Sequence, residues 1–184
     1  MTTTATTTQI PTGTWAVDPG HSSVGFAVKH MGIATVRGTF GEFEGTLEIG
    51  ENGARAWGSA DAASISTGEP QRDTHLKSPD FFDVETFPKI EFESTSIEAL
   101  DDEEFRITGN LTMHGITKEI VLHADYQGTD IDPWGGTRIG LEVTGQINRS
   151  DWEMKFNQAL GSGNLMVADK VKLEIDVSAV KQES

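Results

Sequence analysis

Histidine is the residue type in this sequence best suited to metal binding or proton transfer, because a neutral imidazole is a good ligand and titrates near neutral pH. The chain has five, at His21, His30, His75, His114 and His123. His21 and His30 are nine residues apart, which would place them on opposite faces of a regular strand. His114 and His123 flank a predicted turn and could approach each other, but no third ligand is in register with them. We therefore predict no metal site and expect structural hydrogen bonds.

Other motifs that could support binding or catalysis are incomplete. Residues 130–135 begin like a calcium loop, yet Trp134 and Leu141 occupy its fifth and twelfth positions, where carboxylates are required. The glycines around Ser162 do not form the Gly-x-Ser-x-Gly pattern of a hydrolase nucleophile elbow. The chain has no cysteine, so thiolate nucleophiles and disulfides are excluded. We therefore predict that the protein is not an enzyme and needs no cofactor.

The charge balance excludes several partners. The formal net charge is −15, from 29 acidic and 14 basic residues, and no run of the sequence clusters Lys or Arg. Such a chain repels nucleic acid, and an anionic membrane surface is disfavoured for the same reason. No stretch approaches the ~20 apolar residues of a membrane span, so stable insertion is not expected. The Thr-rich start does not resemble a secretory signal, which predicts a cytoplasmic location if the chain is complete.

The elements that must position any site are strands. Apolar and polar residues alternate along most of the chain, as in antiparallel strands with one buried face. The predicted strands cover 24–30, 35–49, 55–65, 90–97, 105–113, 120–126, 139–147 and 171–177. The alternation changes parity between Phe40 and Phe43, which predicts a β-bulge, and the turn at Gly115-Ile116 predicts a hairpin. Eight or nine antiparallel strands commonly close into a barrel, since closure removes exposed edges.

One segment has the features of a short helix. Residues 70–78 carry Pro70 at the position of a first helical turn, Asp73 and Lys77 at i,i+4 spacing, and Pro79 just beyond the end. A helix this short is marginal by itself, so it should dock on the barrel as a lid or plug. Its charged residues Arg72 and Asp73 are expected to tie it to the barrel backbone, because a charge at a buried docking site must be paired.

A long irregular segment and a polar tail complete the predicted organisation. Residues 151–167 carry apolar side chains among glycine and polar residues, and such a loop is expected to pack over the barrel. Residues 1–12 form a Thr-rich tail that we expect to be disordered, which leaves 13–184 as a single domain.

Short motifs distributed over the chain match one known family. They are Trp15-Ala-Val-Asp18, His21-Ser-Ser-Val-Gly-Phe26, His30-Met31, Val36-Arg-Gly-Thr-Phe40, Arg72-Asp-Thr-His75-Leu, Ser78-Pro-Asp-Phe-Phe-Asp83, Phe87-Pro88, Gly109-Asn-Leu-Thr-Met-His-Gly115-Ile-Thr117 and Asn148-Arg149. In these the chain resembles the YceI-like family of lipocalin-like, isoprenoid-binding bacterial proteins, from Trp15 to about Val180. The resemblance implies an all-β, eight-stranded antiparallel lipocalin-like barrel with one or two short helical lids. It also implies an elongated cavity for a polyisoprenoid chain, frequent homodimers and no catalytic activity.

The sequence departs from that family at two points. Many members carry an export signal, whereas this chain shows none. After Arg149 the family pattern is Asp-Phe-Gly, but here Asp151-Trp152-Glu153 follows, and the missing glycine changes what the backbone of that loop can adopt.

The expected ligand is a long isoprenoid lipid, polyprenyl or quinone-type, held without chemistry in the barrel. The candidate ligand-binding residues are Phe26, Val28, Phe40, Phe43, His75, Leu76, Phe81, Phe82, Ile90, Phe92, Leu111, Met113, Ile120, Leu122, Ile139, Leu141, Arg149, Trp152, Met154 and Phe156. The candidates for contact with a polar head group are His75 together with either Arg37 or Arg149. Two alternatives remain: a structural or stress-response interaction module with a filled barrel, and a barrel enzyme acting on a small apolar substrate.

Overall fold

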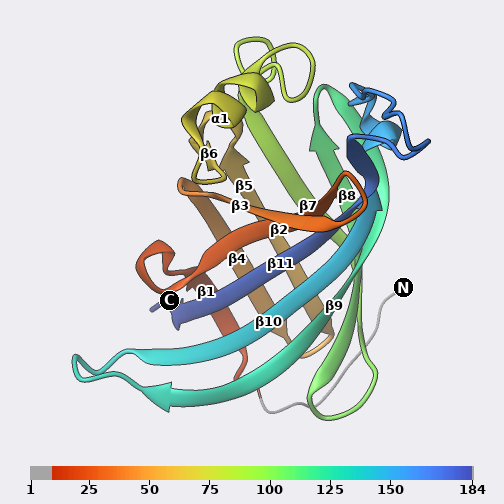
Figure 1. The fold of residues 1–184 in the computed structure, drawn as a ribbon. Coiled ribbons are helices and arrows are strands. Elements are labelled where there is room, and N and C mark those ends of the chain that lie inside the picture. The colour runs from red at the N-terminus through yellow and green to blue at the C-terminus, as the bar shows by residue number, and fades with distance from the viewer. Residues whose placement is uncertain (1–9, 184) are drawn as a thin grey trace.

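The computed structural model describes residues 10–183, and these form a barrel of antiparallel strands (Figure 1). The strands are β1 (Gly13–Val17), β2 (Ser23–His30), β3 (Ala34–Phe40), β4 (Phe43–Gly50), β5 (Gly53–Asp61), β6 (Ile65–Ser66), β7 (Lys89–Ala99), β8 (Glu104–Met113), β9 (Ile116–Ile131), β10 (Thr137–Asn148) and β11 (Val167–Lys181). Eight of them close a ring in the order β1-β4-β5-β7-β8-β9-β10-β11, because β11 also pairs with β1. The predicted eight-stranded antiparallel lipocalin-like barrel is confirmed.

The ring of eight strands is closed only by the C-terminal part of β11. The last residues of β11 pair with β1, whereas its first part pairs with β2, which continues to β3 and then β6. The 3-10 helix η1 (Pro19–His21) separates β1 from β2, so the two strands follow one edge of β11 with an interruption between them. On β4, the pairing with β1 begins at Thr46, and Phe43 to Gly45 have no recorded partner on that side. The wall of the barrel therefore has a seam between η1 and the start of β4.

Side chains from one face of every ring strand form the core inside the barrel. The alternation predicted from sequence is visible in β8, where Phe105, Leu111 and Met113 are buried and Arg106 and Asn110 are exposed. The predicted hairpin joins β8 to β9. Its two turn residues, His114 and Gly115, both have positive φ, as the right-handed twist of a two-residue hairpin requires.

Helical segments and loops cover one end of the barrel, which we call the roof (Figure 1). They comprise η2 (Ala62–Ser64), α1 (Pro70–Lys77) with the segment that follows it, and η3 (Arg149–Trp152) with the loop that leads to β11. The helix prediction is confirmed: Pro70 occupies its first turn and Glu69 caps it by accepting a hydrogen bond from the Gln71 amide. The helix ends at Lys77, one residue earlier than predicted.

Arg72 and Asp73 do not tie the helix to the barrel backbone as expected: both bond to Thr67, in the segment between β6 and α1, and Arg72 is exposed. Asp73 accepts hydrogen bonds from the Thr67 amide at 2.9 Å and from its hydroxyl at 2.6 Å. Arg72 donates to the Thr67 hydroxyl at 2.7 Å and to its carbonyl at 3.1 Å.

Three local expectations need correction. The parity change near Phe40 is not a bulge within one strand. The strand stops, and the amides of Gly41 and Glu42 bond to the backbone and side chain of Ser64 before β4 begins. His21 lies in η1 rather than on a strand, with its imidazole on Asp18. Ile10, assigned to the polar tail, is buried against the core, while residues 1–9 lie outside the described part.

Candidate functional site

The barrel encloses an apolar cavity of about 250 Å³. Its lining comes from strands all around the ring, with Val17 on β1, Leu47 on β4, Ile107 on β8 and Ile175 on β11 among the contributors. It also reaches the seam, because Ser22 lines it on one side and Phe43 to Gly45 line it on the other. The inside of the barrel is thus neither completely filled nor open from end to end.

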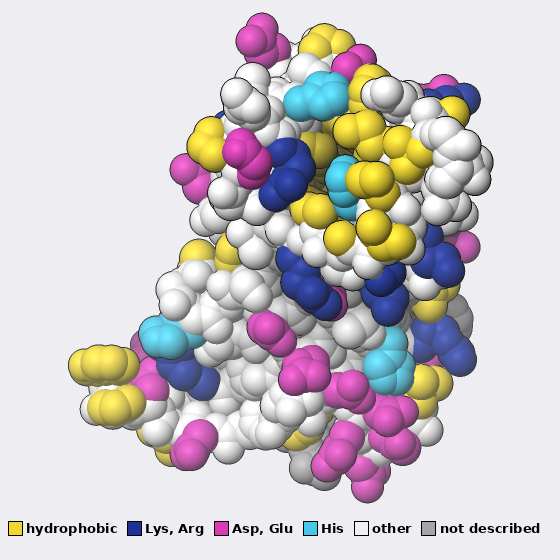
Figure 2. Space-filling view, viewed as in Figure 1, with side chains coloured by type: hydrophobic (Ala, Val, Ile, Leu, Met, Phe, Trp, Pro, Cys, Tyr) yellow, Lys and Arg dark blue, Asp and Glu magenta, His cyan; other side chains and the backbone are white. Residues whose placement is uncertain are grey.

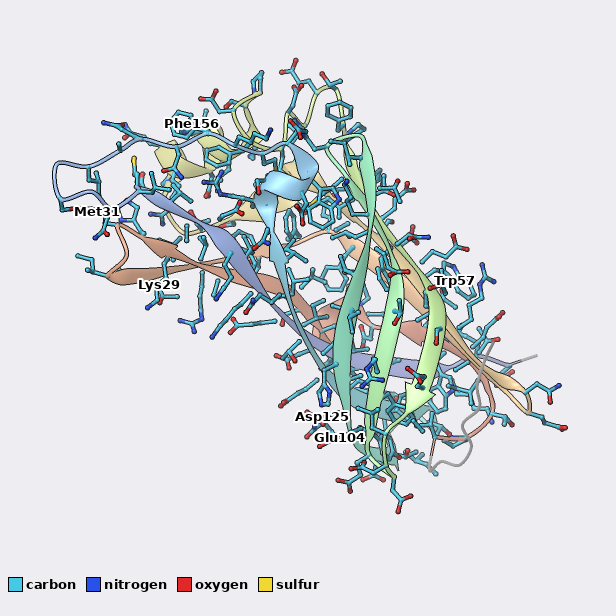
Figure 3. All side chains as sticks on the ribbon, turned by 90° about the vertical axis from the view of Figure 1, so that its right-hand side faces the viewer. Lys29, Met31, Trp57, Glu104, Asp125 and Phe156 are labelled. Atoms are coloured by element: carbon cyan, nitrogen blue, oxygen red, sulfur yellow. The ribbon has the colours of Figure 1, made fainter. Side chains whose placement is uncertain are left out.

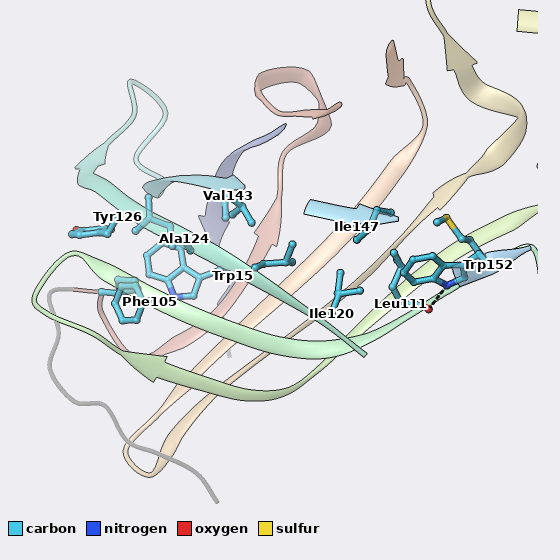
Figure 4. Packing of buried hydrophobic residues seen from close by; sticks show 14 of the residues in the cluster. Trp15, Phe105, Leu111, Ile120, Ala124, Tyr126, Val143, Ile147 and Trp152 are labelled. Carbon is cyan, nitrogen blue, oxygen red and sulfur yellow. Dashed lines mark hydrogen bonds between the residues drawn. The ribbon is translucent and has the colours of Figure 1, made fainter. Parts of the chain in front are cut away.

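A tryptophan lies at each end of the buried core, beyond the residues that line the cavity (Figure 4). Trp15 is fully buried among Phe105, Ala124 and Tyr126 at the end away from the roof, and its indole Nε1 donates to the Pro11 carbonyl at 3.1 Å. Sequence analysis used Trp15 only as a family motif and missed this role. The signal available was its position at the start of the first strand, where a large side chain can fill a barrel end.

At the roof, Trp152 from η3 fills the opposite end. It is almost completely buried, and its indole Nε1 donates to the Leu111 carbonyl at 3.0 Å (Figure 4). Met154, the next buried residue of the loop, packs in the same core cluster. Glu153 stands where the family pattern has glycine. It nevertheless takes the left-handed conformation that glycine favours, with φ 61°.

Small residues on the inner face of β5 leave room for the cavity. Ala56, Gly58 and Ala60 alternate along this strand with outward-facing residues, and all three line the cavity. Trp57, between them, faces outward, where the Arg55 guanidinium lies 4.2 Å from the centre of its ring (Figure 3). Sequence analysis missed this wall because a search for large apolar residues passes over a period-2 row of alanine and glycine.

The predicted ligand-binding residues fall into separate groups. Those that line the cavity are Phe43, Ile90, Phe92, Leu111, Ile120, Leu122 and Leu141. Met113, Ile139, Trp152 and Met154 are buried in the main core without lining the cavity, and Val28 lies half-buried on β2 opposite Val171. Phe26, Phe40, Leu76 and Phe82 meet in a second apolar cluster around Ile65, between the roof helix and β3.

Three of the remaining four predicted residues lie together at the roof. His75 packs edge-on against Phe81 and Phe156, with ring centres 5.1 and 4.7 Å away, and its Nε2 is 2.8 Å from a carboxylate oxygen of Asp80. The buried Phe81 lies 5.4 Å from Phe156, between ring centres. His75 itself remains partly exposed, so this aromatic group presents a polar ring to solvent.

Arg149 is buried and bonded entirely to backbone. Its guanidinium donates to the carbonyls of Met154, Val167 and Ala168 at 2.6 to 3.2 Å. Desolvation by burial lowers its pKa, and the nearby Asp169 carboxylate opposes that shift. These three bonds join η3, its loop and the start of β11, so Arg149 positions the roof.

The groups with perturbed pKa values lie outside the cavity. The Arg138 guanidinium donates to Asp18 and Asp132, each at 2.8 Å. This contact, followed by His21 and the Gly20 amide, lowers the pKa of Asp18 to about 2. Among residues 10–183 the other shifted groups are ion-paired in the same way, apart from Arg149, and none of them lines the cavity.

One group of side chains has spacing that a metal ion could use. Glu104, His123 and Asp125 bring one ligand atom each to within 4.8 Å of one another on the outer face of β8 and β9 (Figure 3). Sequence analysis considered His123 only together with His114 and did not foresee this group, in which strand pairing places Glu104 opposite Asp125. All three are half-exposed, and they lie far from the inward-facing residues of the cavity.

Comparison with known proteins places the fold in a family. Residues 15–179 match the YceI-like domain. Protein YceI of Salmonella arizonae is 37% identical over 166 residues, which are 89% of this chain and 83% of that protein. The crystal structure of the Campylobacter jejuni YCEI protein superposes with a TM-score of 0.72 at 31% identity, covering 90% and 96% of the two chains.

A more distant structure shares the fold alone. It is a polyisoprenoid-binding domain from Saccharophagus degradans, with a TM-score of 0.68 at 14% identity over 91% of this chain and 98% of that one. The family match, the sequence relatives and the closed barrel agree. The chain belongs to the YceI-like domain family.

Proposed function

We propose that this protein binds an isoprenoid lipid, polyprenyl or quinone-type, in its barrel cavity and carries or stores it without chemical change. The observation that carries the proposal is the apolar cavity between Trp15 and Trp152, with its wall of small residues on β5. An isoprenoid tail has no polar groups, so such a lining can bind it by removing apolar area from water at ~25 cal/mol per Å². The polyisoprenoid-binding domain with the same fold supports this ligand class.

The volume of the cavity sets the length of chain that fits. At about 250 Å³ it lies near the lower end of the ~300–1,000 Å³ typical of small-molecule sites. A long chain therefore needs additional space, and the roof is the end where one side chain, Trp152, limits it. We propose that a long isoprenoid displaces Trp152 and that its head group then meets the partly exposed His75 at the roof. Arg149 acts through the position of the roof loop, since its donors already bind backbone carbonyls.

Extraction and mass spectrometry test the proposal. Protein purified from several hosts is extracted with organic solvent, and a prenyl lipid is expected in stoichiometric amount. Ala56→Phe should fill the cavity from the β5 wall, and Leu111→Trp should fill it from β8, and each should abolish retention of the lipid. Overpacking costs about 1–3 kcal/mol, so folding is checked by circular dichroism. Ala99→Phe, at an exposed alanine at the end of β7, is the matched control.

Two outcomes would contradict the carrier. Empty extracts from every host, together with failure of added prenyl lipids to bind, would refute it. Retention of lipid by folded Ala56→Phe and Leu111→Trp would place the ligand elsewhere.

The modest cavity volume favours one second candidate, a structural or stress-response module with a nearly filled barrel. If the protein is such a module, the extracts should be empty, and filling the cavity with Ala56→Phe should not change them. An enzyme acting on a small apolar substrate would need a reactive group facing the cavity. Among residues 10–183, the lining is predominantly apolar and contains no histidine, lysine or arginine, which supports a non-catalytic role.

A further inference from the structure

The outer face of the barrel carries a group of basic residues that sequence order conceals. On neighbouring strands β3, β2 and β11, Arg37 and Lys172 flank Ala27, and Lys29 lies in the next row outward along β2. Lys170 follows on β11, two residues from Lys172 on the same exposed face. We call Lys29, Arg37, Lys170 and Lys172 the basic patch. Only Arg37 has an ion-pair partner among residues 10–183, Glu174 at 3.3 Å.

The charge on this face reverses along the strands. Toward the other end of the barrel, paired outward-facing residues place four carboxylates in one row across β8 to β11. They are Glu104, Asp125, Glu142 and Asp176. Figure 2 shows the two zones: Lys and Arg side chains across the middle of the face, and acidic side chains at its lower right. The net charge of −15 is therefore unevenly distributed, and one end of this face is locally basic.

Exposed apolar side chains lie next to the basic patch. The turn between β2 and β3 packs against the loop before β11, with the Met31 amide donating to the Met166 carbonyl at 2.8 Å. Together the two segments expose Ile33 (78%), Leu165 (52%) and Met31 (39%), which we call the apolar apex. Lys29 is two residues from Met31 on the same hairpin, so basic and apolar groups share one end of the molecule (Figure 3).

A second apolar tip provides a contrast within the same protein. The β9–β10 hairpin exposes Ile131 (67%) and Trp134 (83%). Asp130 and Asp132 lie on either side of Ile131, Asp132 is ion-paired with Arg138 at 2.8 Å, and residues 130–138 contain no lysine. Two tips of similar apolar exposure thus differ in the sign of the charge beside them.

We propose that the apolar apex and the basic patch dock this protein on an anionic lipid surface. Exposed apolar groups enter the headgroup region, and nearby lysines are attracted to anionic headgroups. The carboxylate row lies at the far end of the same face, so repulsion from the surface orients the apex toward it. This docking requires no transmembrane helix, and none among residues 10–183 is long and apolar enough to cross a membrane. It goes beyond lipid carriage and does not require the cavity to be loaded.

Vesicle co-sedimentation tests the docking surface. The probes are vesicles of phosphatidylcholine alone and of equal parts phosphatidylcholine and phosphatidylglycerol, at low and physiological salt. The wild-type protein should bind the anionic vesicles, and binding should weaken as salt rises, because exposed charges are screened beyond ~8 Å. One lysine near an anionic surface contributes about fivefold in affinity, so K170E/K172E should reduce binding at least ~20-fold. Ile33→Asp should also weaken it severalfold.

Matched controls separate docking from general effects. Lys181→Glu, at an exposed lysine at the other end of β11, and Ile131→Asp, at the acidic tip, should leave vesicle binding unchanged. Ala56→Phe should dock like wild type even though it is expected to lose the lipid, so failure of docking and failure of carriage are distinguishable. The proposal is wrong if wild-type protein ignores anionic vesicles, if K170E/K172E binds them as wild type does, or if Ile131→Asp is as damaging as Ile33→Asp.

Discussion

Trp152 fills the roof end of the buried core, and its replacement tests how much this packing stabilises the fold. Trp152→Phe keeps most of the apolar volume but removes the indole donor to the Leu111 carbonyl, a buried bond of 3.0 Å. Loss of one partner of a buried hydrogen bond costs about 1–3 kcal/mol. Trp152→Ala also empties the site, which for a fully buried tryptophan costs about 3–5 kcal/mol. The two variants should therefore lower the free energy of unfolding in that order.

Equilibrium urea unfolding followed by far-ultraviolet circular dichroism measures both effects. This signal does not depend on the tryptophan that is removed. Trp134→Phe is the control, because the Trp134 side chain is 83% exposed and a surface replacement is expected to change stability by less than about 0.5 kcal/mol. If Trp152→Phe matches Trp134→Phe, the indole bond at the roof does not contribute and Trp152 is not a stabilising plug. Trp152→Ala should also release a bound prenyl lipid faster than wild type.

Two further predictions concern polar contacts outside the cavity. Asp73→Ala should lower the free energy of unfolding by about 1–3 kcal/mol, because it removes two bonds to Thr67, whereas Asp73→Asn keeps an acceptor and should cost less; equal losses in thermal melts would contradict this. Arg138 holds the pKa of Asp18 at about 2, below its unfolded value, so this contact stabilises the fold above about pH 4 and less as pH falls toward 2. Arg138→Gln should therefore show a shallower loss of melting temperature across that window, and an unchanged slope would refute the assignment.

The regular part of the fold follows from local patterns. Alternation in segments such as 105–113 and 171–177 depends only on which face is buried, and that face is the same for every strand of a closed barrel. The β8–β9 hairpin follows because a two-residue turn fixes the register of its strands. The helix at Pro70 follows from capping and proline, which act within one turn.

The site was harder to predict, because it depends on small residues where large ones are missing and on contacts between residues far apart in sequence. The cavity owes its space to alanine and glycine on β5, and these residues carry no strong hydrophobic signal. The break after Phe40 depends on Ser64, which is more than twenty residues away in sequence. The basic patch escaped a search for clustered lysines because strand pairing, rather than sequence order, brings Lys29 beside the lysines of β11.

Different parts of the chain determine the width and the length of the cavity. Its width depends on the small side chains of β5, so a larger residue at Ala56 narrows the cavity at the level of that residue. Its length is expected to depend on Trp15 and Trp152, which fill the two ends of the buried core beyond the cavity lining and lie outside β5. Trp15 lies on a ring strand, whereas Trp152 belongs to a 3-10 helix followed by a loop, so movement of Trp152 disturbs fewer ladder bonds. Selection for chain length in this barrel is therefore expected to act through the roof.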